Sequence, residues 1–249
     1  MLLDDQNAVV FGASGAIASQ VARRLAGEGA VVWLSVRRGE AVKQLAEEIS
    51  ESGGKAYVQE VDALSPETVE AYLETIAATG SVDIVFNGIG GAPAELGYPA
   101  RALDQDVDAF LLPMRTIVGS QFLTASGAAR HMSQRGTGSI ITISAGLSTL
   151  SVPHMAGISA ACAAVEAMTR SLAAEFGSSG IRVNCVRSSA MPETRTIRES
   201  RAGHSRLGTE PTSGSNALGR PLTVNDTAGA VTFLASGLAA GLCGQVIAL

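Results

Sequence analysis

NAVVFGASGAIA (residues 7–18) contains the clearest fold signal in the chain. Its first five residues form an apolar run of strand length, and Gly12 and Gly15 follow at once, where glycine favours a tight turn. A helical stretch then continues to Gly27. A strand that turns directly into a helix is the opening unit of an α/β sheet.

The alternation of strand and helix continues to the end of the chain. Strand-like runs follow at 30–35, 56–61, 81–87, 138–144, 180–186 and 245–249, and helical stretches lie at 39–51, 66–78, 103–132, 156–176 and 223–235. The strand runs are continuously apolar, which is typical of parallel strands covered by helices on both faces. We therefore predict one α/β domain over residues 1–249, built on a doubly wound parallel sheet of about seven strands.

Composition excludes several classes of protein. The chain has 249 residues, of which 46% are hydrophobic and 16% charged, as expected for a large buried core. The net charge of −5 favours neither nucleic acid nor anionic membrane. The three cysteines are scattered without metal-ligand spacing, and the first residues carry acids where a secretory signal carries bases. We expect a cytoplasmic protein that acts on a small molecule and has no metal site.

Five motifs stand in a recognisable order: FGASGAIA (11–18), Asp62, FNGIG (86–90), AMTRSLAAEFGSSGIRVN (167–184) and GRPLTVNDTAGAVTFLAS (219–236). In order and register they resemble the motifs of the classical short-chain dehydrogenase/reductase family, over nearly the whole chain. The resemblance implies a Rossmann-type sheet, a nicotinamide cofactor, a small organic carbonyl or alcohol as substrate, and a homodimer or homotetramer.

The glycine turn bears on cofactor binding, because such glycines let the backbone approach a pyrophosphate at the helix N-terminus. Gly12 occupies the family's first glycine position, whereas Ala16 and Ala18 occupy the next two. Arg37 and Arg38 end the second strand, which favours the 2′-phosphate of NADP(H) over NAD(H). A turn that only joins strand to helix stays open as an alternative. The resemblance assigns cofactor binding to Gly12, Ser14, Gly15, Ile17, Arg37, Arg38, Asp62, Asn87 and Gly88.

The positions of the family's catalytic residues carry other side chains. In the family, a tyrosine exchanges a proton with the substrate oxygen, and a lysine four residues later lowers the pKa of that tyrosine. A serine and an asparagine complete the set. Register places Ile158, Cys162, Ala145 and Ile117 at these four positions, and no tyrosine in the sequence is followed four residues later by a lysine. The resemblance therefore implies the fold without the standard reaction.

Replacement groups are sought in the same cleft. His154 is a candidate general acid/base, because histidine titrates near neutral pH, and a hydrogen-bonded loop histidine is the alternative. Ser144 is a second candidate. We expect Cys162 to be inert, since its neighbours are alanines, and Glu166 to face solvent or a partner subunit. Further hydroxyls that could bind a ligand here are Ser148, Ser188, Ser189 and Thr194.

Residues 188–219 are the compositional outlier, rich in Ser, Gly, Thr and Arg, and we predict a mobile loop that acts as a lid. Its basic side chains suit an anionic substrate, although a solvated loop would also contain them. These side chains are Arg195, Arg198, Arg201, His204 and Arg206.

Three functions stay open at this point. The first is a divergent NADP(H)-linked oxidoreductase in which water or His154 replaces the tyrosine. The second is a cofactor-independent or non-redox enzyme, such as a lyase, isomerase or cyclase, that reuses the substrate cleft. The third is a catalytically inactive binding or partner protein.

Overall fold

The computed structural model of the chain describes residues 1–209 and 218–249. It contains a parallel seven-stranded sheet in the order β3-β2-β1-β4-β5-β6-β7, which confirms the predicted fold. The direction of strand addition reverses between β1 and β4, so the carboxyl ends of these two strands flank the usual ligand crevice of a doubly wound sheet. The strands are β1 Asn7–Phe11, β2 Val31–Val36, β3 Lys55–Glu60, β4 Ile84–Asn87, β5 Gly138–Ala145, β6 Ile181–Ser188 and β7 Val246–Ala248.

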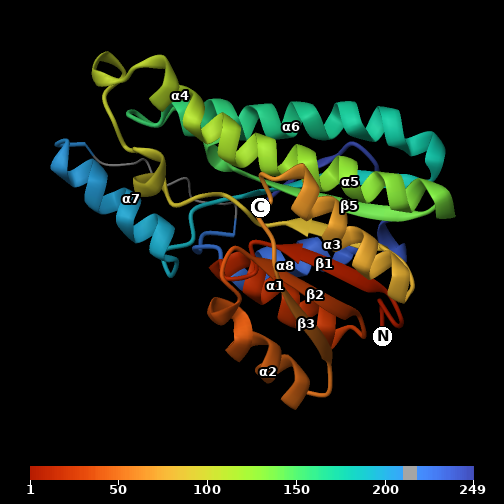
Figure 1. Cartoon of the computed structure of the whole chain (residues 1–249). Helices are drawn as coiled ribbons and strands as arrows, with labels where there is room; N and C mark the ends of the chain where they lie inside the picture. Colours follow the sequence, from red (N-terminus) through yellow and green to blue (C-terminus); the bar gives the residue numbers. More distant parts are fainter. Residues whose placement is uncertain (210–217) are drawn as a thin grey trace.

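Helices cover both faces of the sheet (Figure 1). One layer contains α1, α2 and α8, and the other contains α3, α5 and α6. Neighbouring residues of one strand point to opposite faces, so Ile141 belongs to the first core and Ile140 to the second. The helices of these two layers are α1 Ala16–Gly27, α2 Lys43–Glu51, α3 Pro66–Thr79, α5 Gly119–Arg135, α6 Ala156–Phe176 and α8 Val224–Ala235.

The predicted single helix over 103–132 is divided in the structure. It consists of α4 (Val107–Pro113), a π-helical turn (Met114–Val118) and α5. Pro113 has no N–H group to donate to the helical ladder, which accounts for a change of hydrogen bonding at this place. Single π-turns of this kind are frequent beside functional sites.

The prediction of a loop over 188–219 is wrong for part of that segment, because residues Arg195–Arg206 form helix α7. Thr194 caps this helix by accepting a hydrogen bond from the Ile197 N–H at 3.4 Å. In Figure 1, α7 lies apart from both helical layers, and it packs against the short helix η2 (Pro93–Leu96). Residues 210–217 of the predicted lid lie outside the described residues.

Candidate functional site

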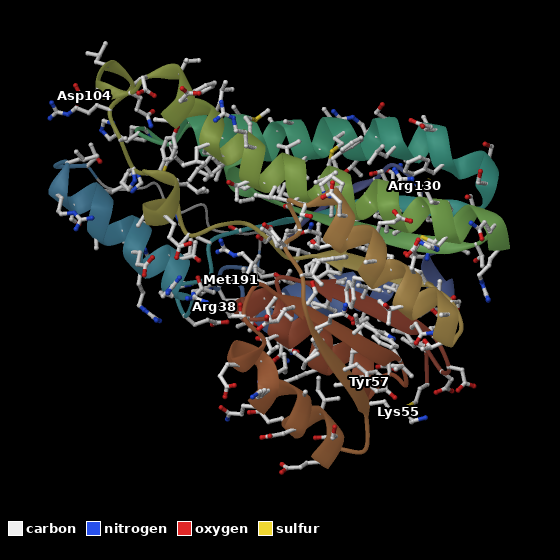
Figure 2. All side chains as sticks on the ribbon, in the orientation of Figure 1. Arg38, Lys55, Tyr57, Asp104, Arg130 and Met191 are labelled. Atoms are coloured by element: carbon white, nitrogen blue, oxygen red, sulfur yellow. The ribbon has the colours of Figure 1, made fainter. Side chains whose placement is uncertain are left out.

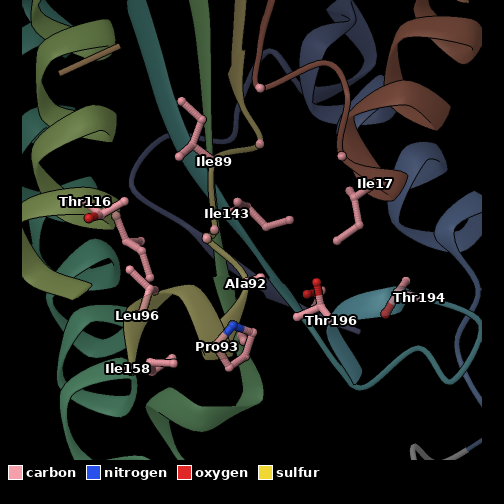
Figure 3. Close-up of a pocket in the computed structure, with 18 of the residues that line it drawn as sticks. Ile17, Ile89, Ala92, Pro93, Leu96, Thr116, Ile143, Ile158, Thr194 and Thr196 are labelled. Atoms are coloured by element: carbon pink, nitrogen blue, oxygen red, sulfur yellow. The ribbon is translucent and has the colours of Figure 1, made fainter. Parts of the chain in front are cut away.

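A cavity of about 720 Å³ lies at the carboxyl ends of the strands. This volume lies within the range of roughly 300–1,000 Å³ that small-molecule sites occupy. Figure 3 shows Ile17 of α1 and Thr194 on one side of the cavity, with Thr116 and Ile158 on the other. The cavity therefore joins the glycine turn after β1 to the amino-terminal part of α6 and to α7.

The turn between β1 and α1 forms the first wall of the cavity. Gly12 has φ +71°, and a Cβ atom at this position would lie 2.8 Å from Ile89 Cγ1. The N–H groups of Gly12 and Ala13 donate to the Ser35 carbonyl at 3.0 and 3.1 Å. Gly15 then precedes α1 and has no side chain to cap the helix. The first N–H groups of α1 are therefore suited to an anion in the cavity.

Ala18, at the family's third glycine position, fits without separating α1 from the sheet. Its methyl group faces Gly88, where an added Cβ would lie only 2.7 Å away from the Ala18 Cβ. Gly88 thus leaves the space that the methyl group of Ala18 fills. The close approach of α1 and the sheet behind the turn is therefore kept, although the residue without a side chain is Gly88 after β4 and not a glycine within α1.

The structure brings most of the predicted cofactor residues together. The cavity lining in the described chain includes Gly12, Ser14, Gly15, Ile17, Arg37, Asp62 and Gly88 but not Arg38 or Asn87. Arg38 is exposed, and in the view of Figure 2 its label stands beside that of Met191, which lines the cavity. The Asn87 side chain is buried, donates to Thr124 Oγ1 at 2.9 Å and accepts from the Ile89 N–H at 2.8 Å.

The four residues at the family's catalytic positions also meet at the cavity. Ile117, Ala145, Ile158 and Cys162 all line it, and they belong to one apolar cluster around the start of α6. Burial raises the pKa of the Cys162 thiol to about 11, so the thiol stays protonated at neutral pH. This is in line with an inert cysteine.

The sequence-based expectation that Glu166 faces solvent or a partner subunit is wrong. Glu166 is 6% exposed and lies between α6 and the sheet. Its carboxylate accepts hydrogen bonds from Arg187 Nε at 2.8 Å and Arg187 Nη2 at 2.6 Å. Ser144 Oγ donates to the same carboxylate at 2.8 Å. Burial pushes the pKa of Glu166 upward, but hydrogen bonds from Arg187 and from the Ser144 hydroxyl lower it to about 2.

Of the two predicted catalytic residues, Ser144 lines the cavity, and His154 lies outside the lining formed by the described residues. The Ser144 hydroxyl donates a hydrogen bond to Glu166 and accepts a weak hydrogen bond from Cys185 Sγ at 3.5 Å. His154 has φ +62°, and its carbonyl accepts from the Ala100 N–H at 2.9 Å.

Within residues 1–209 and 218–249, no group of three or more His, Cys, Asp or Glu side chains is placed to hold a metal ion. Across the same ranges, no helix combines the length and the apolar character needed to cross a membrane.

Comparison with known proteins places the chain in a family. A family model described as enoyl-(acyl carrier protein) reductase matches residues 12–249. The chain is also 32% identical over 245 residues to a 7alpha-hydroxysteroid dehydrogenase of Clostridium sardiniense, with 94% of this chain and 87% of the relative covered. The chain belongs to the short-chain dehydrogenase/reductase family. It therefore carries the fold of an oxidoreductase family.

Solved structures of short-chain dehydrogenases/reductases agree with this. A 7 alpha-hydroxysteroid dehydrogenase complexed with NADH and 7-oxo glycochenodeoxycholic acid superposes with a TM-score of 0.83 at 25% identity, covering 99% of this chain and 93% of that one. A putative NAD(P)-dependent gluconate 5-dehydrogenase from Beutenbergia cavernae, with NADP bound at low occupancy, has a TM-score of 0.83 at 28% identity, covering 99% of this chain and 95% of that one. Both cofactors thus occur among similar members of the family.

Sequence reasoning missed the pairing of Glu166 with Arg187, although each residue carries a usable signal. Glu166 is an acid within an alanine-rich helix, and Arg187 is a base at the end of the apolar run of β6. Two opposite charges in two apolar elements predict a buried pair once the elements are known to be neighbours. Only the three-dimensional arrangement shows that they are.

Proposed function

We propose that the protein is an NADP(H)-linked oxidoreductase that acts on a small organic carbonyl or alcohol by a non-standard mechanism. The observation that carries this proposal is the continuity of the cavity, since its lining joins Gly12 and Arg37 to the apolar residues around Ile158. The membership in an oxidoreductase family and the similar structure with bound NADP support it.

The residues present fit a dinucleotide. Gly12 and Gly15 would let the diphosphate approach the start of α1, and Arg37 at the end of β2 would bind a 2′-phosphate. Asp62 lies after β3, at the position that the family uses near the adenine. The cofactor supplies the hydride when it is bound. The protein holds the cofactor and the substrate in position and orients them toward each other.

The source of the proton is the non-standard part. Ile158, Cys162 and Ala145 occupy the positions of the family's proton-transfer residues. We infer that none of them transfers the proton, because an alkyl group has no exchangeable proton and a thiol with a pKa of about 11 is a poor donor at neutral pH. The sequence leaves water and His154 as alternatives. Water is favoured, because His154 lies outside the described cavity lining. Ser144 then serves as a hydrogen-bond partner of the ligand and not as the acid, since its hydroxyl already donates a hydrogen bond to Glu166.

A second candidate function is ligand binding or non-redox chemistry in the same cavity. It is favoured by the apolar character of the wall formed by Ile117, Ala145 and Ile158, where the family places its catalytic side chains. In this alternative the dinucleotide would bind without giving up a hydride.

We also propose that the chain forms a homodimer or homotetramer through α5 and α6. Phe122 on α5 is 48% exposed, and Ala163 and Ala167 form an exposed small-residue side of α6. Light scattering would test this proposal, with Ala163→Glu expected to give a monomer.

The function is tested with NADPH that carries deuterium at either face of C4, incubated with a panel of cyclic ketones. Mass spectrometry of the alcohols should show deuterium from one of the two labelled forms only. The double variant Ile158→Tyr/Cys162→Lys should react faster, since it installs the family's pair. If NADPH binds to both proteins and neither transfers the label, the second candidate function is favoured instead.

A further inference from the structure

One face of α7 is fixed against the rest of the protein. His204 is fully buried, and its Nε2 lies 3.1 Å from the Pro153 carbonyl oxygen, in the loop before α6. Gly203 packs so closely that an added Cβ would lie 2.5 Å from Pro99 Cδ. Within the two helical turns before these contacts, Ile197, Ser200 and Arg201 are spaced as neighbours on one side of the helix, and all three line the cavity.

The half of the cavity beside α7 is lined by one acid and two bases. Its charged lining residues are Glu95, Arg195 and Arg201. Arg195 lies 3.4 Å from Glu95 and 3.4 Å from Glu199, so its charge is balanced. Arg201 makes no ion pair and no side-chain hydrogen bond with any residue of the described ranges 1–209 and 218–249. Its guanidinium is therefore available to an anionic group of a ligand.

The remainder of this half is apolar. Its side chains come from η2, from the loop after β5 and from the start of α6, and they are Leu96, Leu147, Leu150, Val152, Met155 and Ile158. A ligand that fills it gains free energy by burying an apolar body. Figure 3 shows Leu96 and Ile158 on the same side of the cavity, across from Thr194 and Thr196 at the start of α7.

We propose that this half of the cavity binds an amphipathic monocarboxylate, whose carboxylate pairs with Arg201 and whose apolar body lies on the wall around Ile158. A carboxylate matches the two-pronged geometry of a guanidinium. This ligand class deepens the proposed function by naming the class of substrate. Conversion of the ligand rests on the proposed function, whereas its binding does not. Binding of the carboxylate is independent of the cofactor.

The test uses octanoate and 1-octanol, which share an apolar chain and differ in the anionic group. Calorimetry at pH 7.5 should show octanoate binding at least about tenfold more tightly than 1-octanol. Arg201→Gln should remove this preference by weakening octanoate alone. Arg198→Gln is the matched control, because Arg198 lies on the same helix, is exposed, and donates to the Glu193 carbonyl instead of lining the cavity. It should keep the preference.

Equal affinity of the wild-type protein for the two compounds would overturn the proposal, and so would the absence of octanoate binding or an equal loss in both variants. Arg201→Glu is a second check. Because this variant places a negative charge in the cavity, it should bind octyltrimethylammonium more tightly than octanoate. NADPH is titrated in parallel with each protein. If octanoate binds as expected and NADPH does not bind, the ligand class stands and the proposed oxidoreductase function fails.

Discussion

The Glu166 carboxylate and the Arg187 guanidinium form a two-bond ion pair, at 2.8 and 2.6 Å, directly behind the cavity-lining Ser144. The side chains are 8% and 23% exposed, so the pair joins α6 to the end of β6 in a largely dry environment. In such places the gain from pairing is offset by desolvation, but the loss of one partner leaves the other charge buried. This asymmetry determines what substitutions should do.

Glu166→Gln should lower the free energy of unfolding by about 2–3 kcal/mol, since Arg187 then keeps its charge without a counter-ion. The double variant Glu166→Leu/Arg187→Met should recover most of this loss. Urea unfolding measures both values, and Glu175→Gln, an exposed acid on the same helix, is the control. A loss of less than about 0.5 kcal/mol in Glu166→Gln would mean that the pair contributes no more than a surface pair.

The same pair predicts a dependence of stability on acid pH. The folded-state pKa of Glu166 is about 2, below its ordinary value of 4.5, because hydrogen bonds from Arg187 and the Ser144 hydroxyl favour the charged form. A lowered pKa contributes stability that is fully present above about pH 4.5 and is lost as the pH falls toward 2. The contribution is on the order of 3 kcal/mol. The stability difference between wild type and Glu166→Gln should therefore shrink as urea unfolding is repeated from pH 5 down to pH 3. A difference that stays constant over this range would contradict the assignment.

The contact between Ala18 and Gly88 predicts an unusual rescue. Gly88→Ala should destabilise the protein by about 1–3 kcal/mol, since the new methyl group would lie 2.7 Å from that of Ala18. Ala18→Gly in the same chain should restore part of the stability, although a contact of 3.1 Å with the Phe86 ring remains. Thermal unfolding of both single variants and the double variant measures the coupling. Strict additivity would show that the two positions do not share this space.

Arg37 and Arg38 should differ in their effect on cofactor choice. Arg37 lines the cavity and Arg38 does not, although both are exposed. Arg37→Gln should weaken NADPH binding about tenfold, or about 1.4 kcal/mol, and leave NADH binding unchanged. Arg38→Gln should have the smaller effect on both. Fluorescence titration of the reduced cofactors provides the measurement, and the opposite order would assign the 2′-phosphate to Arg38.

The fold was predictable from the sequence because most of the parallel strands are buried, short, mainly apolar and regularly spaced. The edge strand β3, Lys55–Glu60, is the exception, since it is largely exposed and contains charged and polar side chains. Helix α6 was predicted with its observed bounds because its alanine-rich stretch is uninterrupted. Helix α7 was missed because Ile197 is almost its sole apolar residue, so no apolar periodicity marks it. Its burial depends on His204 and Gly203, which contact residues about fifty and one hundred positions earlier.

The candidate site was predictable only where position in the fold determines contact. Residues that follow the strand ends, such as Gly12, Arg37 and Asp62, reach the cavity because parallel strands end at one edge. Asn87 satisfies the same rule, yet its side chain turns to Thr124 on α5. The environment of Glu166 depends on a contact across elements, which no local pattern in the sequence contains.

The most direct test of the account is a titration of the wild-type protein with NADPH and with NADH by calorimetry under the same conditions. Because Arg37 lines the cavity and no acid ends β2, NADPH should bind at least about tenfold more tightly than NADH. Failure of both cofactors to bind at millimolar concentration would contradict the assignment of this cavity to a dinucleotide.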